Sequence, residues 1–223
     1  MIKILFTEVL EHLLNENYFS TFSYRKRDCR FIKNNELGFE AIEFQYWDGF
    51  DLLRNKRSLV IKPLYLKRFH ILHTWFEKYS FKTKADQRDN FSIGFDGGML
   101  NKKNEFHFLL DNTDFQKDFD FFSNEVIKTS DYVFCKIKTL QNLFEHQIIP
   151  LLKYQSKLPD VGADWIFEYL SLTRIVEPLH YVEIKEMILL HVETLYNKGE
   201  LNIKEYYPKF TEITEYLEIL FPA

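Results

Sequence analysis

Three side chains that can bind a metal ion or transfer protons recur at helical spacing between residues 70 and 77. His70, His73 and Glu77 stand at positions i, i+3 and i+7, so one helix would present all three on the same face. Two imidazoles and a carboxylate suit zinc or iron. However, the pattern H-E-x-x-H is absent, and no spacing supplies a fourth ligand. We therefore predict no metal ion and no cofactor. His70, His73 and Glu77 are retained only as weak candidates for metal ligands.

Arginines gather at two of the turns expected in the first third of the chain. In an antiparallel meander the first and third turns lie at the same end of the sheet, so the two groups are predicted to meet there. Guanidinium groups beside aromatic rings suit phosphate, RNA or an acidic protein. The predicted binding residues are Arg25, Arg27, Arg54, Arg57, Tyr46 and Trp47. The alternative interpretation is solubilising charge on two loops.

The charge of the chain is unevenly distributed. Residues 1–110 hold 18 Lys and Arg against 14 Asp and Glu, whereas residues 111–223 hold 11 against 19, for net charges of +4 and −8. Either the two halves pack against each other, or the basic half faces an acidic partner. A net charge of +4 is small for a nucleic-acid-binding protein, and no nucleic-acid motif is present. We expect an acidic protein as the partner, rather than nucleic acid or a membrane.

The composition is that of a folded globular protein. Apolar residues make up 46% and charged residues 28% of the 223 residues, which excludes a disordered tail, a collagen-like chain and a small disulfide scaffold. Residues 1–14 read as an amphipathic helix rather than a secretory signal, so we predict a cytoplasmic protein. Cys29 and Cys135 are expected to be reduced thiols, with Cys135 in the core.

The positions of these side chains depend on an expected sheet. A helix is predicted over 2–15, followed by strands at 18–24, 29–33, 39–47 and 58–66 with turns at 25–28, 34–38 and 48–49. Pro63 indicates an edge strand or a bulge. A helix at 69–79 precedes a hairpin of 91–95 with 105–110, which would extend the sheet. Helices are predicted over 115–129, 132–152, from 160 or 164 to 175, 178–196 and 203–220.

These elements predict an α+β fold. An antiparallel β-meander in the N-terminal half is packed by helices, and the C-terminal half is all-helical, because strands and helices are segregated along the chain. We expect one unit over 1–223. The alternative is a sheet-rich part at 1–110 and a helical part at 111–223, or a boundary near 155.

Three segments within 15–150 carry a resemblance of pattern. These are 14–24, Ile42-Glu43-Phe44-Gln45 and 90–95. Together they resemble small bacterial α+β domains of uncharacterised function, some of them suspected immunity partners of secreted toxins. The resemblance implies an interaction protein and no catalytic motif.

Two classes of function therefore stay open. The first is a non-catalytic binding or protein-interaction protein, because no acid, base, metal or phosphate-binding motif converges. The second is a small enzyme whose site is assembled from distant residues, with His70, His73 and Glu77 joined by a residue of the helical half. Histidines that converge on a carboxylate in a deep pocket would favour the enzyme.

Overall fold

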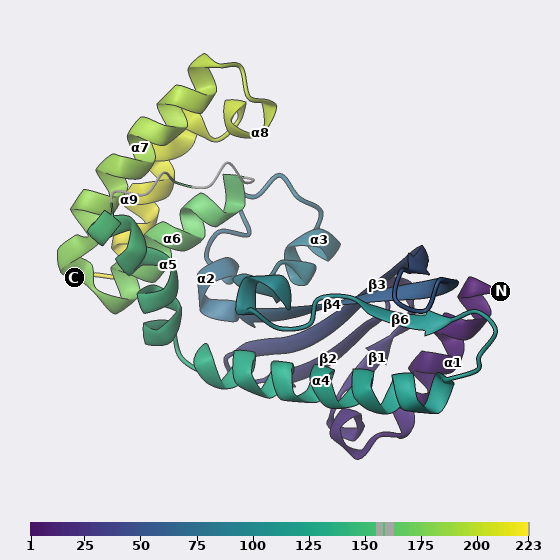
Figure 1. Cartoon of the computed structure of the whole chain (residues 1–223). Coiled ribbons are helices and arrows are strands. Elements are labelled where there is room, and N and C mark those ends of the chain that lie inside the picture. Colours follow the sequence, from purple (N-terminus) through teal and green to yellow (C-terminus); the bar gives the residue numbers. More distant parts are fainter. Residues whose placement is uncertain (155–157, 159–162, 223) are drawn as a thin grey trace. The chain divides into compact units, whose positions relative to one another are not determined.

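The computed structural model describes residues 1–154, 158 and 163–222, which form an α+β protein (Figure 1). The chain divides into two compact units, which we describe separately: a sheet unit of residues 1–68 and 93–136, and a helical unit of residues 69–92 and 137–223. The chain therefore passes between the units at 68/69, 92/93 and 136/137.

The sheet unit contains six strands and two long helices among its described residues. The helices are α1 (Ile2–Asn15) and α4 (Phe115–Lys136). The strands are β1 (Ser23–Arg25), β2 (Arg30–Asn35), β3 (Gly38–Asp51), β4 (Lys56–Phe69), β5 (Ile93–Asp96) and β6 (Phe106–Leu109). Short 3-10 helices lie at Asn17–Thr21 (η1), Lys26–Asp28 (η2) and Gly98–Leu100 (η3).

Strands β1 to β4 form the predicted antiparallel meander, but the last two strands do not form a hairpin with each other. Residues 93–96 of β5 pair with 67–64 of β4, and residues 106–109 of β6 pair with 61–58 of the same strand. Both strands therefore follow one edge of β4 in succession. The sequence shows two strands joined by a turn, and this pattern cannot distinguish mutual pairing from shared pairing with a third strand.

Pro63 does not lie in an edge strand, because β4 has β3 on one side and β5 with β6 on the other. The proline falls between the segment that pairs with β6 and the segment that pairs with β5. On the side of β5 and β6, the missing N–H of Pro63 interrupts no ladder, because neither strand pairs with this residue.

Other boundaries also differ from the prediction. The alternating segment 18–24 is mostly the 3-10 helix η1, and only Ser23 and Tyr24 of it belong to β1. Asp48 and Gly49 do not form a turn, because β3 continues through them to Asp51 and the connection to β4 is 52–55. Gly49 is needed here for close approach: a Cβ on it would lie 2.3 Å from Val60 Cγ2.

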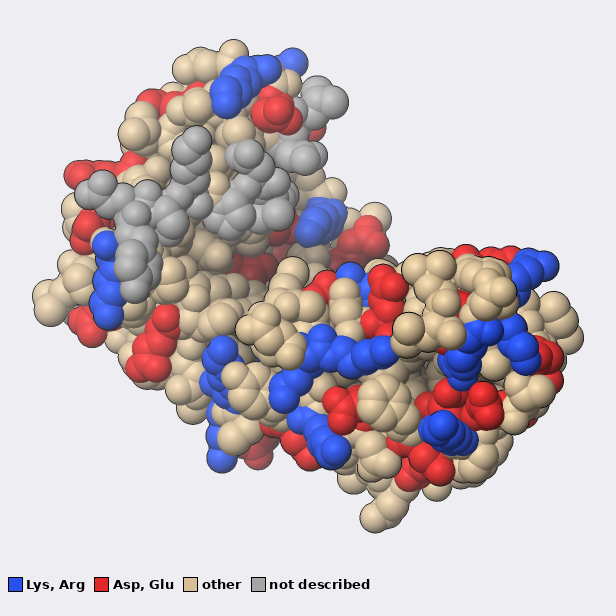
Figure 2. Space-filling view, in the orientation of Figure 1, with Lys and Arg blue, Asp and Glu red and all other residues tan. Residues whose placement is uncertain are grey.

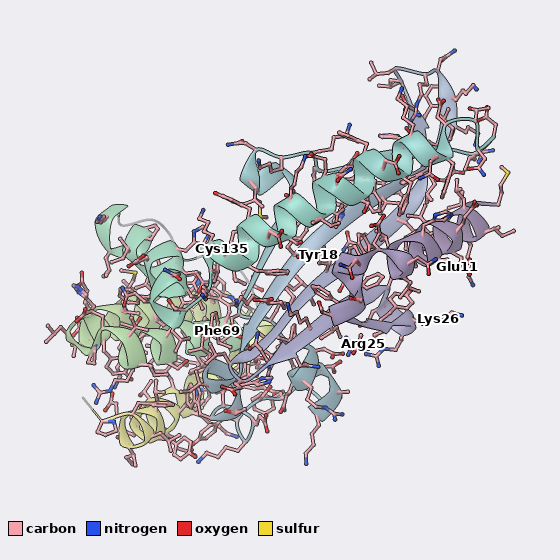
Figure 3. All side chains as sticks on the ribbon, turned by 90° about the horizontal axis from the view of Figure 1, so that it is seen from below. Glu11, Tyr18, Arg25, Lys26, Phe69 and Cys135 are labelled. Carbon is pink, nitrogen blue, oxygen red and sulfur yellow. The ribbon has the colours of Figure 1, made fainter. Side chains whose placement is uncertain are left out.

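Helices α1 and α4 cover one face of this sheet (Figures 1 and 3). The His12 ring of α1 lies 5.0 Å from the Phe115 ring of α4, so the helices are neighbours. Phe122 of α4 contacts Phe44 of β3 at 5.8 Å and Phe106 of β6 at 5.0 Å, measured between ring centroids. The many aromatic residues of the sequence thus build the core between these helices and the sheet.

The helical unit contains the remaining described helices. These are α2 (His70–Thr74), α3 (Lys84–Asp89), α5 (Leu140–Tyr154), α6 (Ala163–Val176), α7 (Tyr181–Asn197), α8 (Leu201–Lys204) and α9 (Phe210–Leu220), with 3-10 turns at Pro178–His180 (η4) and Tyr207–Lys209 (η5). The Phe76 ring stacks on Phe167 of α6 with centroids 4.6 Å apart. Gly199 has a φ of 80° after α7, as the predicted helix end requires.

Candidate functional site

The connection between β3 and β4, residues 52–55, is a tightly held loop that we call the tip. The Asp51 carboxylate accepts the backbone N–H groups of Leu53 and Arg54, both at 3.0 Å, which is an Asx-type turn. Asn55 completes the reversal with a φ of 53°, a conformation that asparagine tolerates better than most residues. Local hydrogen bonds therefore fix the backbone of the tip.

The guanidinium group of Arg54 anchors this tip to two other elements. Its Nε donates to Asp51 at 2.7 Å, Nη1 donates to Asp118 of α4 at 2.6 Å, and Nη2 donates to the His107 carbonyl of β6 at 2.9 Å. The planar arrangement of donors in arginine allows these three directions at once. Arg54 therefore joins the tip, the first turns of α4 and the edge strand β6.

The electrostatics of Asp51 reflect this anchor. Burial alone would raise the pKa of its carboxyl group, but the hydrogen bonds and positive charge of Arg54 outweigh burial and hold the pKa below its ordinary value. In turn, burial would lower the pKa of Arg54, whereas hydrogen bonds to Asp118 and Asp51 raise it. The ion pair is thus charged at neutral pH.

Apolar side chains project from the rigid tip. Leu52 is 85% exposed and Leu53 is 98% exposed. Phe50 at the end of β3 and Phe121 on α4 are also exposed. Single exposed leucines are ordinary on protein surfaces, but two adjacent ones on a hydrogen-bonded turn beside exposed aromatic rings form a contiguous apolar surface.

An open groove of about 590 Å³ lies against the tip. Its volume falls within the range of about 300–1,000 Å³ that is typical of binding pockets. The groove is lined by the end of β3 and the tip, by β6 with the loop before it, and by α4 with the residue that precedes it. The lining residues are Phe50, Asp51, Leu52, Leu53, Arg54, Lys103, Glu105, Phe106, His107, Asp114, Lys117, Asp118 and Phe121. We call the groove and the tip together the hairpin site.

Both signs of charge occur on the rim of the hairpin site. Lys103, Lys117 and Glu105 are exposed and form no ion pair within the described residues, although Lys103 Nζ lies 5.9 Å from the Phe121 ring. Asp114 is 3.8 Å from Arg54 and is about half exposed. Two cations and two carboxylates are thus available to a binding partner.

The structure does not bring the two predicted arginine groups together. Arg30 of β2 pairs with Glu43 of β3, and β3 continues for eight more residues to Asp51 before the tip. At roughly 3.3 Å per residue, the tip is on the order of 25 Å farther along the strand than the first turn. The long β3–β4 hairpin therefore separates Arg54 and Arg57 from Arg25 and Arg27.

The arginines also have nearby carboxylates. Arg25 Nε donates to Asp28 at 2.8 Å, and Arg57 pairs with Asp48. Figure 3 shows Arg25 and Lys26 beside the short first strand, and Figure 2 shows basic and acidic side chains intermixed on the visible face. The sheet unit as a whole holds 17 Lys and Arg and 17 Asp and Glu, so it carries no net charge.

The two predicted aromatic residues do not share a surface. Tyr46 and Trp47 are neighbours in β3, so their side chains point to opposite faces of the sheet. The Tyr46 ring stacks on Phe6 of α1 at 3.9 Å, which makes it part of the packing of that helix. Trp47 is 39% exposed on the other face.

The three metal candidates are also separated. His73 is buried, whereas His70 and Glu77 are exposed, and α2 ends at Thr74 before it reaches Glu77. Across the described part of the chain, no group of three or more His, Cys, Asp or Glu side chains could hold a metal ion.

His73 instead bridges two residues that the sequence did not single out. Its Nε2 lies 2.9 Å from Ser92 Oγ, and its Nδ1 lies 3.1 Å from Glu168 Oε1 on α6. This order of hydroxyl, imidazole and carboxylate is that of a catalytic triad. However, Ser92 is 6% exposed, and its Oγ also accepts the Phe69 N–H at 3.0 Å. The hydroxyl therefore ties together two points of the chain next to the 68/69 and 92/93 crossings.

The helical unit has an apolar surface of its own. Leu179, Val182 and Leu190 are exposed along η4 and α7. Of these three, Val182 lines a cavity of about 370 Å³. A pair between Lys185 and Glu218, 2.8 Å apart, lines this cavity. These side chains project from regular helix and lack the anchored turn that presents Leu52 and Leu53.

Both cysteines are free thiols, and Cys135 is exposed rather than buried as predicted. It lies in the last turn of α4, on the side opposite the buried Val133 and Phe134. No helix within the described residues has the length and apolar character needed to cross a membrane.

Comparisons with known proteins assign no family. No family model matches the chain, and neither a curated protein nor a solved structure gives a match.

Proposed function

We propose that this chain is a non-catalytic protein-interaction protein and that the hairpin site is its binding surface. One observation carries the proposal: a tip held by Arg54 and Asp51 presents Leu52 and Leu53 to solvent at 85% and 98% exposure. A fixed apolar loop loses little conformational entropy on binding, which favours association. The two leucines themselves contribute little to the stability of the folded monomer, because they are not buried there.

The partner that fits is a protein with an apolar surface and carboxylates around it. The leucines supply a desolvated centre, and Lys103 and Lys117 supply cations at the rim, which is the usual arrangement of a protein interface. This retains the predicted acidic partner but moves its contact from the arginine turns to the lysines of the groove. The resemblance to suspected immunity proteins is consistent with such a role.

The test compares Leu52→Ser/Leu53→Ser with a matched control. Leu37 is 58% exposed in the turn between β2 and β3 and belongs to the same unit, so Leu37→Ser is the control. Burial of one leucine contributes about 1.5–3 kcal/mol, so the double variant should bind about 100-fold more weakly or worse.

Immobilised wild type, double variant and control would each be incubated with extract from the native host, and bound proteins quantified by mass spectrometry. Partners retained by wild type and control but lost by the double variant support the proposal. Equal recovery on all three, with unchanged circular dichroism, contradicts it.

A second candidate function is hydrolysis by Ser92, which only the Ser92–His73–Glu168 geometry favours. His73 would accept the hydroxyl proton while Glu168 orients its ring. The burial of Ser92 requires the surrounding segment to open before a substrate reaches Oγ. A fluorophosphonate probe tests this directly: labelling of wild type that Ser92→Ala abolishes supports hydrolysis, and unlabelled folded protein excludes a reactive Ser92.

A further inference from the structure

We infer that the hairpin site is occupied by a second copy of this chain, in a two-fold symmetric dimer. The inference rests on the proposed function and names the partner of the same site. In such a dimer each tip enters the groove of the other copy. This requires the protruding and the receiving surfaces to lie side by side on one molecule. They do so here, because Leu52 and Leu53 themselves line the groove.

The apolar parts of the site are complementary to each other. The tip contributes two exposed leucines, and the groove offers Phe50 and Phe121, both exposed, with Phe106 behind them. Aromatic side chains are enriched at the centres of interfaces because they bury a large apolar area. Two-fold symmetry forms each contact twice, so four leucines become buried while only two short loops have to be ordered.

The charges are complementary as well. The rim of one copy carries Lys103 and Lys117 beside Glu105 and Asp114, and each of these four is exposed. A two-fold axis that places the lysines of one copy opposite the carboxylates of the other leaves no excess of either sign. The sheet unit, which bears the hairpin site, has a net charge of zero, so the net charge of −4 on the full chain comes from the helical unit and not from the proposed interface.

A membrane surface is the competing occupant of an exposed leucine tip, and the charges favour a second copy. An anionic membrane would be attracted by a basic surround, but the lining of the hairpin site contains four carboxylates against three Lys and Arg. Asp51 and Asp118 are already paired with Arg54. The other two, Glu105 and Asp114, would be repelled by lipid phosphates, whereas in the dimer they meet lysines.

The experiment is sedimentation equilibrium on the full chain, with four proteins at concentrations from about 1 to 200 µM, the range in which small interfaces dissociate. Wild type and Leu37→Ser should dimerise. Leu52→Ser/Leu53→Ser should raise the dissociation constant by at least about 100-fold, and Lys103→Glu/Lys117→Glu should weaken the dimer through like charges.

A mixing experiment tests the reciprocal contact. Glu105→Lys should also be weakened as a homodimer, and mixing it with Lys103→Glu/Lys117→Glu should restore association as a heterodimer. A wild-type chain that stays monomeric at the highest concentration overturns the inference, as does a dimer that persists in the double leucine variant. Circular dichroism of each variant excludes unfolding as the cause.

Failure of this inference is distinguishable from failure of the proposed function. If wild type is monomeric but captures partners that Leu52→Ser/Leu53→Ser does not, the dimer is refuted and the interaction function is supported. Liposome co-sedimentation with phosphatidylserine vesicles identifies the membrane alternative: leucine-dependent binding to vesicles by a monomeric protein overturns the dimer in favour of lipid.

Discussion

Replacing Arg54 with alanine should destabilise the protein far more than the exposure of the tip suggests. The substitution removes the cation shared by Asp51 and Asp118, whose side chains are only 11% and 17% exposed. Removal of one partner from a buried ion pair costs about 3–5 kcal/mol. Since the Arg54 side chain itself is 27% exposed, solvent screens part of this, and we expect a loss of about 2–3 kcal/mol.

Two companion variants separate charge from geometry. Arg54→Lys keeps the positive charge but cannot donate to Asp51, Asp118 and the His107 carbonyl at the same time, so it should recover roughly half of the loss. Arg57→Ala removes an arginine that is 65% exposed and pairs with Asp48. Exposed ion pairs contribute little, so this control should change stability by less than about 0.5 kcal/mol.

Urea unfolding at pH 7, followed by circular dichroism, measures all three. The loss for Arg54→Ala corresponds to about 4–12 °C in melting temperature for a chain of this size. An Arg54→Ala protein within about 0.5 kcal/mol of wild type would refute the anchoring role of Arg54. It would also remove the argument that Arg54 pre-organises the tip, because the tip would then keep its structure without the guanidinium group.

Three further predictions concern the rest of the molecule. Asp51 is paired with Arg54, and Asp96 is paired with Lys62 of β4 at 2.7 Å; these contacts hold both carboxyl pKa values below the ordinary value. The two ion pairs therefore stabilise the fold above the unfolded-state pKa of about 3.9, and this contribution should be lost as pH falls below about 4. Acid titration of Arg54→Ala should show a smaller loss than that of wild type. Ser92→Ala removes an acceptor of the Phe69 N–H and a partner of His73, so urea unfolding should show a loss of about 1–3 kcal/mol while the dimer constant stays the same. Ellman's reagent should modify exposed Cys135 rapidly and Cys29 slowly, because burial raises the pKa of the Cys29 thiol; equal rates would contradict this.

Much of the fold could be predicted from periodicity, because long amphipathic segments have one dominant signal. Helix α1 ends where expected, and the meander order of β1 to β4 follows from alternation and turn residues. The partner of β5 and β6 could not be predicted, since their pairing with β4 depends on contacts between residues 26 to 32 positions apart for β5 and 45 to 51 positions apart for β6. The segment 18–24 was predicted as a strand from its alternation, yet residues 17–21 form a 3-10 helix whose Phe19 is buried against Phe31.

The hairpin site could not be predicted because the turn between β3 and β4 was assigned from a single dipeptide. Asp48-Gly49 is a strong turn dipeptide, but the glycine is required by the close approach of Val60. The true turn, 52–55, lies four residues after Asp48-Gly49. Asp51 precedes it and Asn55 ends it, and both residue types are typical of turns. The prediction left 50–57 outside any strand, so it gave no reason to place Leu52 and Leu53 at the end of a long hairpin. Likewise, nothing in the spacing of Ser92, His73 and Glu168 indicates that they meet.

The anchored tip links the stability of this protein to its proposed function. The donors of Arg54 are directed to Asp51, Asp118 and β6, so this arginine holds the loop that we propose as the binding surface. Its removal should therefore weaken binding without removing any contact with the partner, because a mobile tip loses conformational entropy when it binds. Arg54→Ala and Leu52→Ser/Leu53→Ser should differ accordingly: the first lowers both stability and affinity, whereas the second lowers affinity and leaves the unfolding free energy nearly unchanged. Only a pre-organised apolar interface produces that pair of results.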